Sequence, residues 1–340
     1  MIRKTNAWLL LQNIKSYIYF RWWVAANASQ NTSVFVGIKI LTQTKLEIDR
    51  LRNVFKFLLR NLPQDIKLDE MLSYEELLPL DRYILHCLTK YCAQTNELYD
   101  QFNYNKVVLQ TQFFVASTLS AFYFDLVKDR LYCESIDSKE RKSASTVLFH
   151  VLNNLTASIS PILPVLCREV SLNFTALDQK RDVSSLLYQF STNPNWIDDD
   201  LLAQINLLVD LKETIRKTIV SSNPTQSVST KDLNKLELII MPFCEDVCKI
   251  LTKHGHRWLK ELFQVSNIII CNSEADFCDK KNVFGSESYI VHTQDNLKVL
   301  IHQSEYKLCP RCRLYSCDSV DDSETLCNRC DNVMKRMELR

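Results

Sequence analysis

The sequence predicts a mainly α-helical fold, in which an antiparallel helix bundle is followed by a small α/β module and a C-terminal four-cysteine module. Apolar residues recur at helical spacing through the first half of the chain, with short connections between the periodic segments. Short apolar runs of strand length appear in the second half. Two Cys-x-x-Cys pairs, separated by a polar loop, lie near the end of the chain.

Five amphipathic helices are expected in the bundle, because apolar residues recur there every three to four positions. Pro63 ends the first helix, and Asp137 with Glu140 is placed to form a capping box for the fourth. The expected helices span residues 40–62, 81–102, 106–132, 137–160 and 164–170. The third supplies the central buried stripe, formed by Val108, Val115, Leu119, Phe122 and Leu126.

Two features near the start of the chain allow either a structural or an RNA-binding interpretation. The outer face of the first expected helix carries a basic stripe of Lys45, Arg52, Lys56 and Arg60. Such a stripe is usually a solvated face, and an RNA-facing role is the alternative. Trp22 and Trp23 stand beside Arg21 and either pack in the core, which the sequence favours, or stack on bases.

The second half of the chain predicts the α/β module. Asp198, Asp199 and Asp200 suit the N-terminus of a helix, whose buried positions are Leu201, Ile205, Leu208 and Ile215. Strands are expected at residues 235–241, 265–271, 289–292 and 297–302, with one helix at 246–263.

The two cysteine pairs predict a zinc finger. Each Cys-x-x-Cys turn offers two thiolates, and Zn²⁺ takes four such ligands in a tetrahedron: Cys309, Cys312, Cys327 and Cys330. We expect one structural Zn²⁺, with Cys317 as a spare thiol. Arg311 and Arg329 occupy the third position of each turn and are expected to face outward. A disulfide pair or a redox motif is the alternative.

The composition argues against nucleotide chemistry in this chain. Glycine occurs only three times in 340 residues, whereas loops that cradle phosphates need several glycines close together. Neither a G-x-G-x-x-G fingerprint nor a P-loop is therefore possible. None of the six histidines has the spacing of a metal site or an activated nucleophile, so no catalytic residue is predicted.

Charge and cysteine usage limit the setting. The formal net charge is +1, so contact with nucleic acid must come from local patches. The thirteen cysteines, mostly single, favour a reducing compartment. No continuous apolar run approaches the roughly 20 residues of a membrane span. The first 46 residues hold six basic residues and no acid, which is typical of an organelle-targeting segment or of an incorrectly started N-terminus.

Six short segments of the chain, taken in order, resemble segments of one enzyme family. They are Arg21-Trp-Trp-Val-Ala25, Leu51-Arg-Asn-Val-Phe-Lys-Phe-Leu-Leu59, Leu119-Ser-Ala-Phe-Tyr-Phe-Asp125, Lys128-Asp-Arg-Leu-Tyr132, Arg141-Lys-Ser143 and Pro161-Ile-Leu-Pro164. With the two cysteine pairs, they resemble the C-terminal part of isoleucyl-tRNA synthetases, most closely the mitochondrial and bacterial forms. Residues 1–20 match nothing in the family.

The resemblance implies both a domain organisation and a partner. The bundle at residues 21–174 would be a class I anticodon-binding domain, 175–305 an α/β junction module and 306–334 the zinc finger. The partner would be tRNA(Ile), bound by a monomeric chain of the mitochondrial matrix or otherwise the cytoplasm, with no membrane or DNA partner. The tRNA-binding residues would be Arg311, Arg313, Arg329, Trp22, Trp23, Arg52 and Lys56.

The departures from the family are equally informative. The family activates isoleucine in a domain with HIGH-like and KMSKS-like ATP motifs, and neither motif occurs in this sequence. We therefore expect the C-terminal third of such an enzyme, as a fragment or a mis-started gene product, unable by itself to form isoleucyl-adenylate. ATP would be bound only through the domain that is missing here.

Two alternatives stay open at this point. The chain could be a stand-alone zinc-stapled RNA-binding or interaction protein. It could also be a fragment of a valyl- or leucyl-type synthetase, which shares the bundle but not normally a terminal four-cysteine module.

Overall fold

The computed structural model describes residues 14–27, 37–63, 71–174, 193–222, 230–253, 256–283, 289–293, 297–317 and 325–338. The chain divides into two compact units. The first comprises residues up to Val127 together with Ile136–Asp198, and the second comprises Lys128–Ser135 together with the chain from Asp199 onward.

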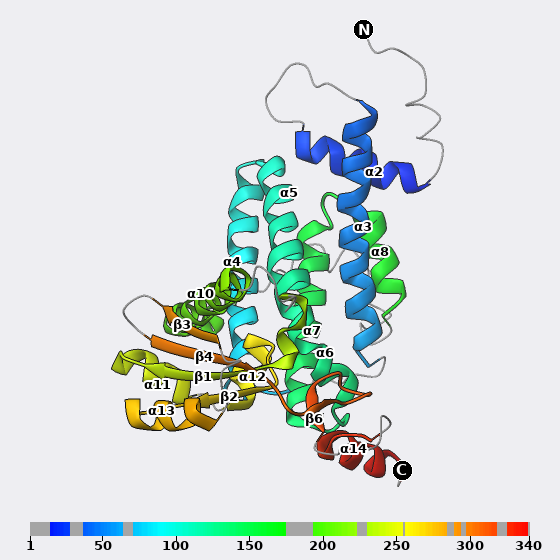
Figure 1. Cartoon of the computed structure of the whole chain (residues 1–340). Helices are drawn as coiled ribbons and strands as arrows, with labels where there is room; N and C mark the ends of the chain where they lie inside the picture. The colour runs from blue at the N-terminus through cyan, green and yellow to red at the C-terminus, as the bar shows by residue number, and fades with distance from the viewer. Residues whose placement is uncertain are drawn as a thin grey trace. The chain divides into compact units, whose positions relative to one another are not determined.

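The first unit is the predicted helix bundle (Figure 1). Helix α4 packs against α5 and α7, α3 packs against α7, and α2 packs against α3 and α5. The helices are α2 (Ile14–Asn27), α3 (Ile38–Asn61), α4 (Pro79–Asp100), α5 (Tyr104–Phe113), η3 (Phe114–Tyr123), the start of α6 (Phe124–Cys133), α7 (Lys139–Ile159) and α8 (Pro164–Leu172). Short 3₁₀ helices occur at η2 (Tyr74–Glu76) and η4 (Pro194–Trp196). All five expected helices are confirmed, and α2 is an additional one.

Helices α5, η3 and α6 follow one another without a break over Tyr104–Cys133. The middle part, η3, is a π-helix, in which Phe124 N–H donates to Leu119 O five residues earlier. A π-turn is wider than an α-turn, so the buried face shifts along the sequence. Leu119 and Tyr123 are fully buried as a result, whereas Phe122 is only half-buried. The expected burial of Phe122 is therefore wrong.

The helix Tyr104–Cys133 also contains an 18-residue window with a mean hydropathy of 1.3, sufficient by length and composition alone to cross a membrane. The core helix of a soluble protein passes the same test. Here the side chains of Val108, Val115 and Leu119 are buried inside the bundle.

The start of α7 lies one residue later than expected. Ser138, not Asp137, is the N-cap, and its hydroxyl oxygen accepts a 3.3 Å hydrogen bond from Arg141 N–H. This satisfies one of the unpaired amide groups of the first turn.

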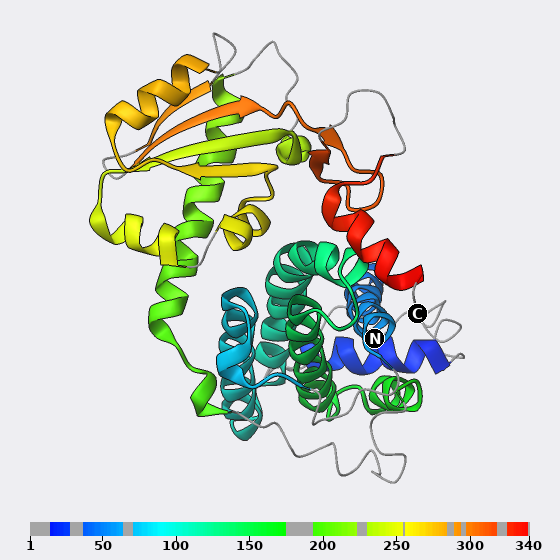
Figure 2. The same cartoon turned by 90° about the horizontal axis from the view of Figure 1, so that it is seen from below.

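The second unit contains a four-stranded sheet of order β2-β1-β4-β3. Strand β1 (Leu236–Pro242) runs parallel to β2 (Asn267–Ile270) and antiparallel to β4 (Leu297–Gln303), which also pairs with β3 (Tyr289–Thr293). Figure 2 shows α10 (Asp199–Ser222) passing behind the strands. The buried positions expected on α10 are confirmed: Leu201, Ile205, Leu208 and Ile215.

The helices of the second unit differ from the expectation in two ways. The single helix expected at 246–263 is two helices, α11 (Glu245–Lys253) and α12 (His256–Phe263). Helix α13 (Glu274–Val283) follows β2 and was not expected. The remaining elements of the described residues are the 3₁₀ helix η5 (Thr230–Lys235), the two-stranded sheet of β5 (Lys307–Leu308) and β6 (Tyr315–Cys317), and helix α14 (Asn328–Glu338).

Leu119 is expected to be a major contributor to bundle stability. Leu119→Ala removes a fully buried side chain and should lower the free energy of unfolding by about 2–5 kcal/mol. Leu109→Ala is the matched control on the same continuous helix, because Leu109 is 62% exposed and its truncation should change stability by less than about 0.5 kcal/mol. Urea denaturation followed by circular dichroism measures both, and equal costs would contradict the packing described above.

Candidate functional site

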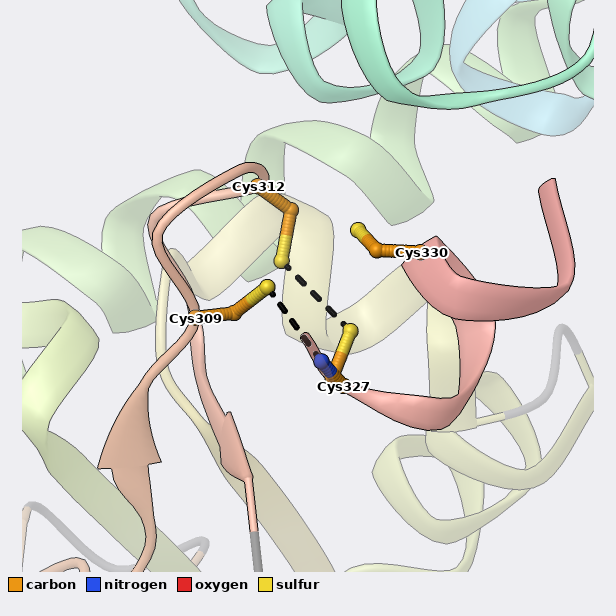
Figure 3. Close-up of side chains that lie close together, drawn as sticks. All are labelled: Cys309, Cys312, Cys327 and Cys330. Carbon is orange, nitrogen blue, oxygen red and sulfur yellow. Dashed lines mark hydrogen bonds between the residues drawn. The ribbon is translucent and has the colours of Figure 1, made fainter. Parts of the chain in front are cut away.

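The two cysteine pairs meet in one buried cluster in the second unit. Cys309 and Cys312 lie on the turn between β5 and β6, while Cys327 and Cys330 lie at the start of α14, and all four side chains point toward one another (Figure 3). Their Sγ atoms all lie within 4.8 Å of one another, and Cys312 Sγ is 3.9 Å from Cys327 Sγ. The sequence prediction that these four residues come together is thus met by the geometry.

Local backbone hydrogen bonds hold each pair in place. Cys309 N–H donates to Leu314 O at 2.8 Å, and Arg313 N–H donates back to Cys309 O at 2.9 Å. Arg313 has a φ of 60°, in the left-handed region, which lets the chain reverse tightly after Cys312. Cys327 N–H donates to Cys309 Sγ at 3.4 Å and so joins the second pair to the first.

The sulfur spacing fits a tetrahedral metal rather than a disulfide. A disulfide needs sulfur atoms about 2.05 Å apart, and all thirteen cysteines are free thiols. Four thiolates at about 2.3 Å from one Zn²⁺ would stand about 3.8 Å from each other. The separation of 3.9 Å between Cys312 Sγ and Cys327 Sγ is close to that value, and all four Sγ atoms lie within 4.8 Å of one another, so a small adjustment reaches that arrangement.

Burial and mutual repulsion prevent the four neighbouring thiols from all ionising in the absence of a cation. Burial raises the pKa of Cys312, and burial with the neighbouring thiols raises that of Cys330 to about 12. Burial acts in the same direction on Cys309, but backbone N–H groups of Cys327, Cys312 and Arg311 outweigh it and lower its pKa to about 6. A bound dication would favour the thiolate at every position.

Two further cysteines pack against this cluster. Cys317 is buried beside it, and its Sγ donates to Thr325 O at 3.4 Å, outside the group of four. Cys133, at the end of α6, is also buried in the cluster, and its Sγ donates to Arg311 O at 3.7 Å. No sequence pattern links Cys133 to residues so far along the chain, so sequence reasoning missed it.

The three arginines of the cysteine module have different surroundings. Arg313 is exposed. Arg311 is half-buried, and its Nη1 donates to Cys133 O at 3.0 Å. The outward orientation expected for Arg329 is wrong: its Nη1 and Nη2 donate to the Asp129 carboxylate at 2.5 and 2.6 Å.

The four other predicted RNA contacts lie in the first unit. Trp22 is 1% exposed, and its Nε1–H donates to Glu47 Oε2 at 3.0 Å, which is the core role that the sequence favoured. Trp23 is half-buried, with its ring centroid 6.1 Å from that of Phe20. Arg52 pairs with Glu169 on α8 at 3.0 Å, whereas Lys56 is exposed.

Sequence reasoning also missed how α2 is fastened to the bundle. Arg21 Nε donates to Ile162 O at 2.7 Å and Nη2 donates to Pro161 O at 2.9 Å. These carbonyl groups follow the end of α7, where no helical partner is available to them. The Arg-Trp-Trp segment is therefore explained by docking of α2: Arg21 binds the α7–α8 connection and Trp22 enters the core.

Comparison with known proteins identifies the class first. Residues 81–232 match the family described as the anticodon-binding domain of tRNA ligase. Most of the bundle after α3, together with α10, thus corresponds to a domain of the aminoacyl-tRNA synthetases.

The particular relatives are isoleucine–tRNA ligases. The chain is 28% identical over 325 residues to the mitochondrial isoleucine–tRNA ligase of Macaca fascicularis and 29% identical over 324 residues to the isoleucine–tRNA ligase of Fervidobacterium nodosum. These alignments cover 92% and 93% of this chain and 32% of each relative. The mitochondrial enzyme of Gallus gallus is 27% identical, over 92% of this chain and 31% of its own length.

The resemblance inferred from the sequence segments is therefore confirmed. Mitochondrial and bacterial relatives match to a similar extent. The chain spans about a third of the length of the curated relatives it matches.

The burial of Trp22 leads to a prediction that separates a core role from base stacking. Trp22→Ala should cost about 3–5 kcal/mol of unfolding free energy, since it empties a buried aromatic site. Lys56→Ala, on the exposed face of α3, should leave stability unchanged within about 0.5 kcal/mol. Thermal unfolding of both variants tests this, and a Trp22→Ala protein as stable as the parent would contradict the core assignment.

Proposed function

We propose that this chain is the tRNA-binding portion of an isoleucine–tRNA ligase. The observation that carries the proposal is the match of residues 81–232 to the anticodon-binding domain of tRNA ligases. In this proposal the bundle at residues 21–174 binds the anticodon stem, 175–305 is a junction module, and the cysteine module at 306–334 contacts the anticodon loop. The bound RNA is tRNA(Ile), and the chain acts as a monomer in that complex.

The surface of the described residues offers cations suited to phosphate binding. Lys45, Lys56 and Arg60 are all exposed along one helix, α3. Arg313 is exposed on the turn that carries Cys309 and Cys312. Because the net charge of the chain is only +1, attraction to RNA must depend on such local groups.

The cysteine cluster supports one structural Zn²⁺. Cys309, Cys312, Cys327 and Cys330 would be its ligands, and a soft set of four thiolates, with no fifth donor grouped with them among the described residues, favours Zn²⁺ in a closed tetrahedral site. When bound, the ion would supply a cross-link between the β5–β6 turn and α14. The four cysteines themselves bring the β5–β6 turn and the start of α14 together, in the arrangement proposed to contact RNA.

We also propose the mitochondrial matrix as the location. Two of the relatives are named as mitochondrial enzymes. Fractionation of cells that express the tagged chain tests this; a purely cytosolic signal would refute it.

Loss of one cluster cysteine should remove the metal. Cys327→Ser should lower zinc content from one ion per chain to near zero and unfold the module, because structural zinc contributes on the order of 10–16 kcal/mol of apparent binding energy in such modules. Cys317→Ser is the matched control, since Cys317 lies beside the cluster but outside the group of four. Mass spectrometric metal analysis of both proteins gives the answer, and full zinc content in Cys327→Ser would exclude this ligand set.

RNA binding should be specific for the anticodon arm and should depend on salt. Fluorescence anisotropy with a tRNA(Ile) transcript is expected to show affinity falling with salt, and Arg313→Ala should reduce the log–log slope by about 0.7 if Arg313 neutralises one phosphate of the single-stranded loop. Lys249→Ala, which removes another exposed cation, on α11, should leave the slope unchanged. Absent or salt-insensitive binding would favour a stand-alone interaction protein, and equal affinity for a transcript with an exchanged anticodon loop would refute loop recognition.

A further inference from the structure

The end of α6 is built into the cysteine module. Residues Lys128–Ser135 belong to the same compact unit as the sheet and the module, although the start of α6 belongs to the bundle. Three residues make the principal contact: Asp129, Glu134 and Arg329, here called the α6 clamp.

The clamp has the geometry of a specific ion pair. Arg329 binds the Asp129 carboxylate end-on, with Nη2 at 2.6 Å from Oδ1 and Nη1 at 2.5 Å from Oδ2, and Nη1 also lies 3.1 Å from Glu134 Oε1. The Arg329 side chain is 28% exposed, Asp129 is 18% and Glu134 is 8%. Two parallel bonds from one guanidinium fix both the distance and the orientation of the partners.

Further charges hold the carboxylates of the clamp in place. Glu134 also accepts a hydrogen bond from Arg257 of α12. Next to Asp129 in the sequence, the fully buried Arg130 pairs with Glu261 of α12 at 3.2 Å. The end of α6 is thus fixed to α12 on one side and to α14 on the other.

A second contact joins the first cysteine pair to the same segment. Arg311 Nη1 donates to Cys133 O at 3.0 Å, and Cys133 Sγ donates to Arg311 O at 3.7 Å. Arg311 stands between Cys309 and Cys312, and Arg329 stands between Cys327 and Cys330. The third residue of each Cys-x-x-Cys turn therefore contacts the end of α6.

We propose that Arg329 is a positioning residue, which fixes the second cysteine pair and α14 on the end of α6, and that it does not bind RNA phosphates itself. Both Nη atoms are engaged by carboxylates, so a phosphate would have to displace them. The carboxylates of Asp129 and Glu134 would in addition repel it. This inference rests on the proposed function, since the group being positioned is the RNA-binding surface around Arg313.

The two possible roles of Arg329 predict opposite signs for one substitution. Asp129→Asn removes a negative charge and leaves the side-chain shape unchanged. If Arg329 bound phosphate, this change would release it and strengthen tRNA binding. If Arg329 positions the module, tRNA(Ile) affinity should fall, by on the order of tenfold, because the bidentate charged contact is lost.

The experiment measures affinity and salt slope together in the zinc-loaded full chain. Arg329→Ala should weaken binding with no change in the log–log slope, whereas loss of a phosphate contact would lower the slope by about 0.7. The double variant of Asp129→Asn with Arg329→Ala should bind no more weakly than Arg329→Ala alone. Asp331→Asn is the matched control: it removes the same charge on α14 beside Cys330, where Asp331 pairs only with Lys335 among the ion pairs described, and it should not weaken binding.

A second measurement separates this inference from the proposed function. Hydrogen exchange of the α14 amides, with zinc retained, should accelerate in Asp129→Asn and stay unchanged in Asp331→Asn. If the parent chain does not bind tRNA but exchange responds in this way, the proposed function fails and the clamp stands. Stronger RNA binding by Asp129→Asn, a reduced slope in Arg329→Ala, or unchanged exchange would each overturn the positioning role.

Discussion

In the C-terminal module the four cysteine side chains take the place of the hydrophobic core that stabilises the rest of the molecule. The module around them has two strands of only two and three residues and one short helix. Among the residues that the structure describes, its buried cluster is made of cysteine side chains, and Leu314 and Leu326 pack against it. Apolar burial on this scale cannot offset the entropy of ordering about thirty residues, so a module of this size needs a cross-link. Its geometry, its orientation and any surface it presents therefore depend on the cysteines.

This dependence explains the charges that surround the module. Four thiolates on one dication would leave a net negative charge, and Asp129 and Glu134 add two more acids nearby. Burial alone would lower the pKa of Arg329, but the hydrogen-bonded Asp129 carboxylate and the neighbouring acids raise it above its usual value. The guanidinium groups of Arg329 and Arg257 neutralise these carboxylates, and a buried acid such as Glu134 would be strongly destabilising without such a partner. Much of the positive charge around the module is thus paired with carboxylates of the protein itself.

The sequence predicted those parts of the structure that depend on local pattern. Helix periodicity located the bundle, and cysteine spacing located the cluster, because each signal is contained within a few turns of chain. The errors arose where tertiary contacts decide. A π-turn moved the buried face away from Phe122. Asp129, 200 residues before Arg329, turned an expected surface arginine inward. No spacing rule relates residues so far apart in the sequence, so the contacts of Cys133 and Arg329 could not be predicted from it.

The arginines and lysines differ in whether they already have a partner inside the protein, and this difference bears on which of them could bind RNA. Arg21 is bound to carbonyl groups, Arg52 to Glu169, and Arg329 to Asp129. Arg313 and Lys56 are exposed and make no ion pair with the residues that the structure describes. A phosphate binds most favourably to a cation that has no partner inside the protein. A cation that is already paired would have to leave its carboxylate unpaired, which costs free energy. In the proposed function, the paired arginines therefore set the shape of the surface, and the exposed Arg313 and Lys56 supply its attraction for a polyanion.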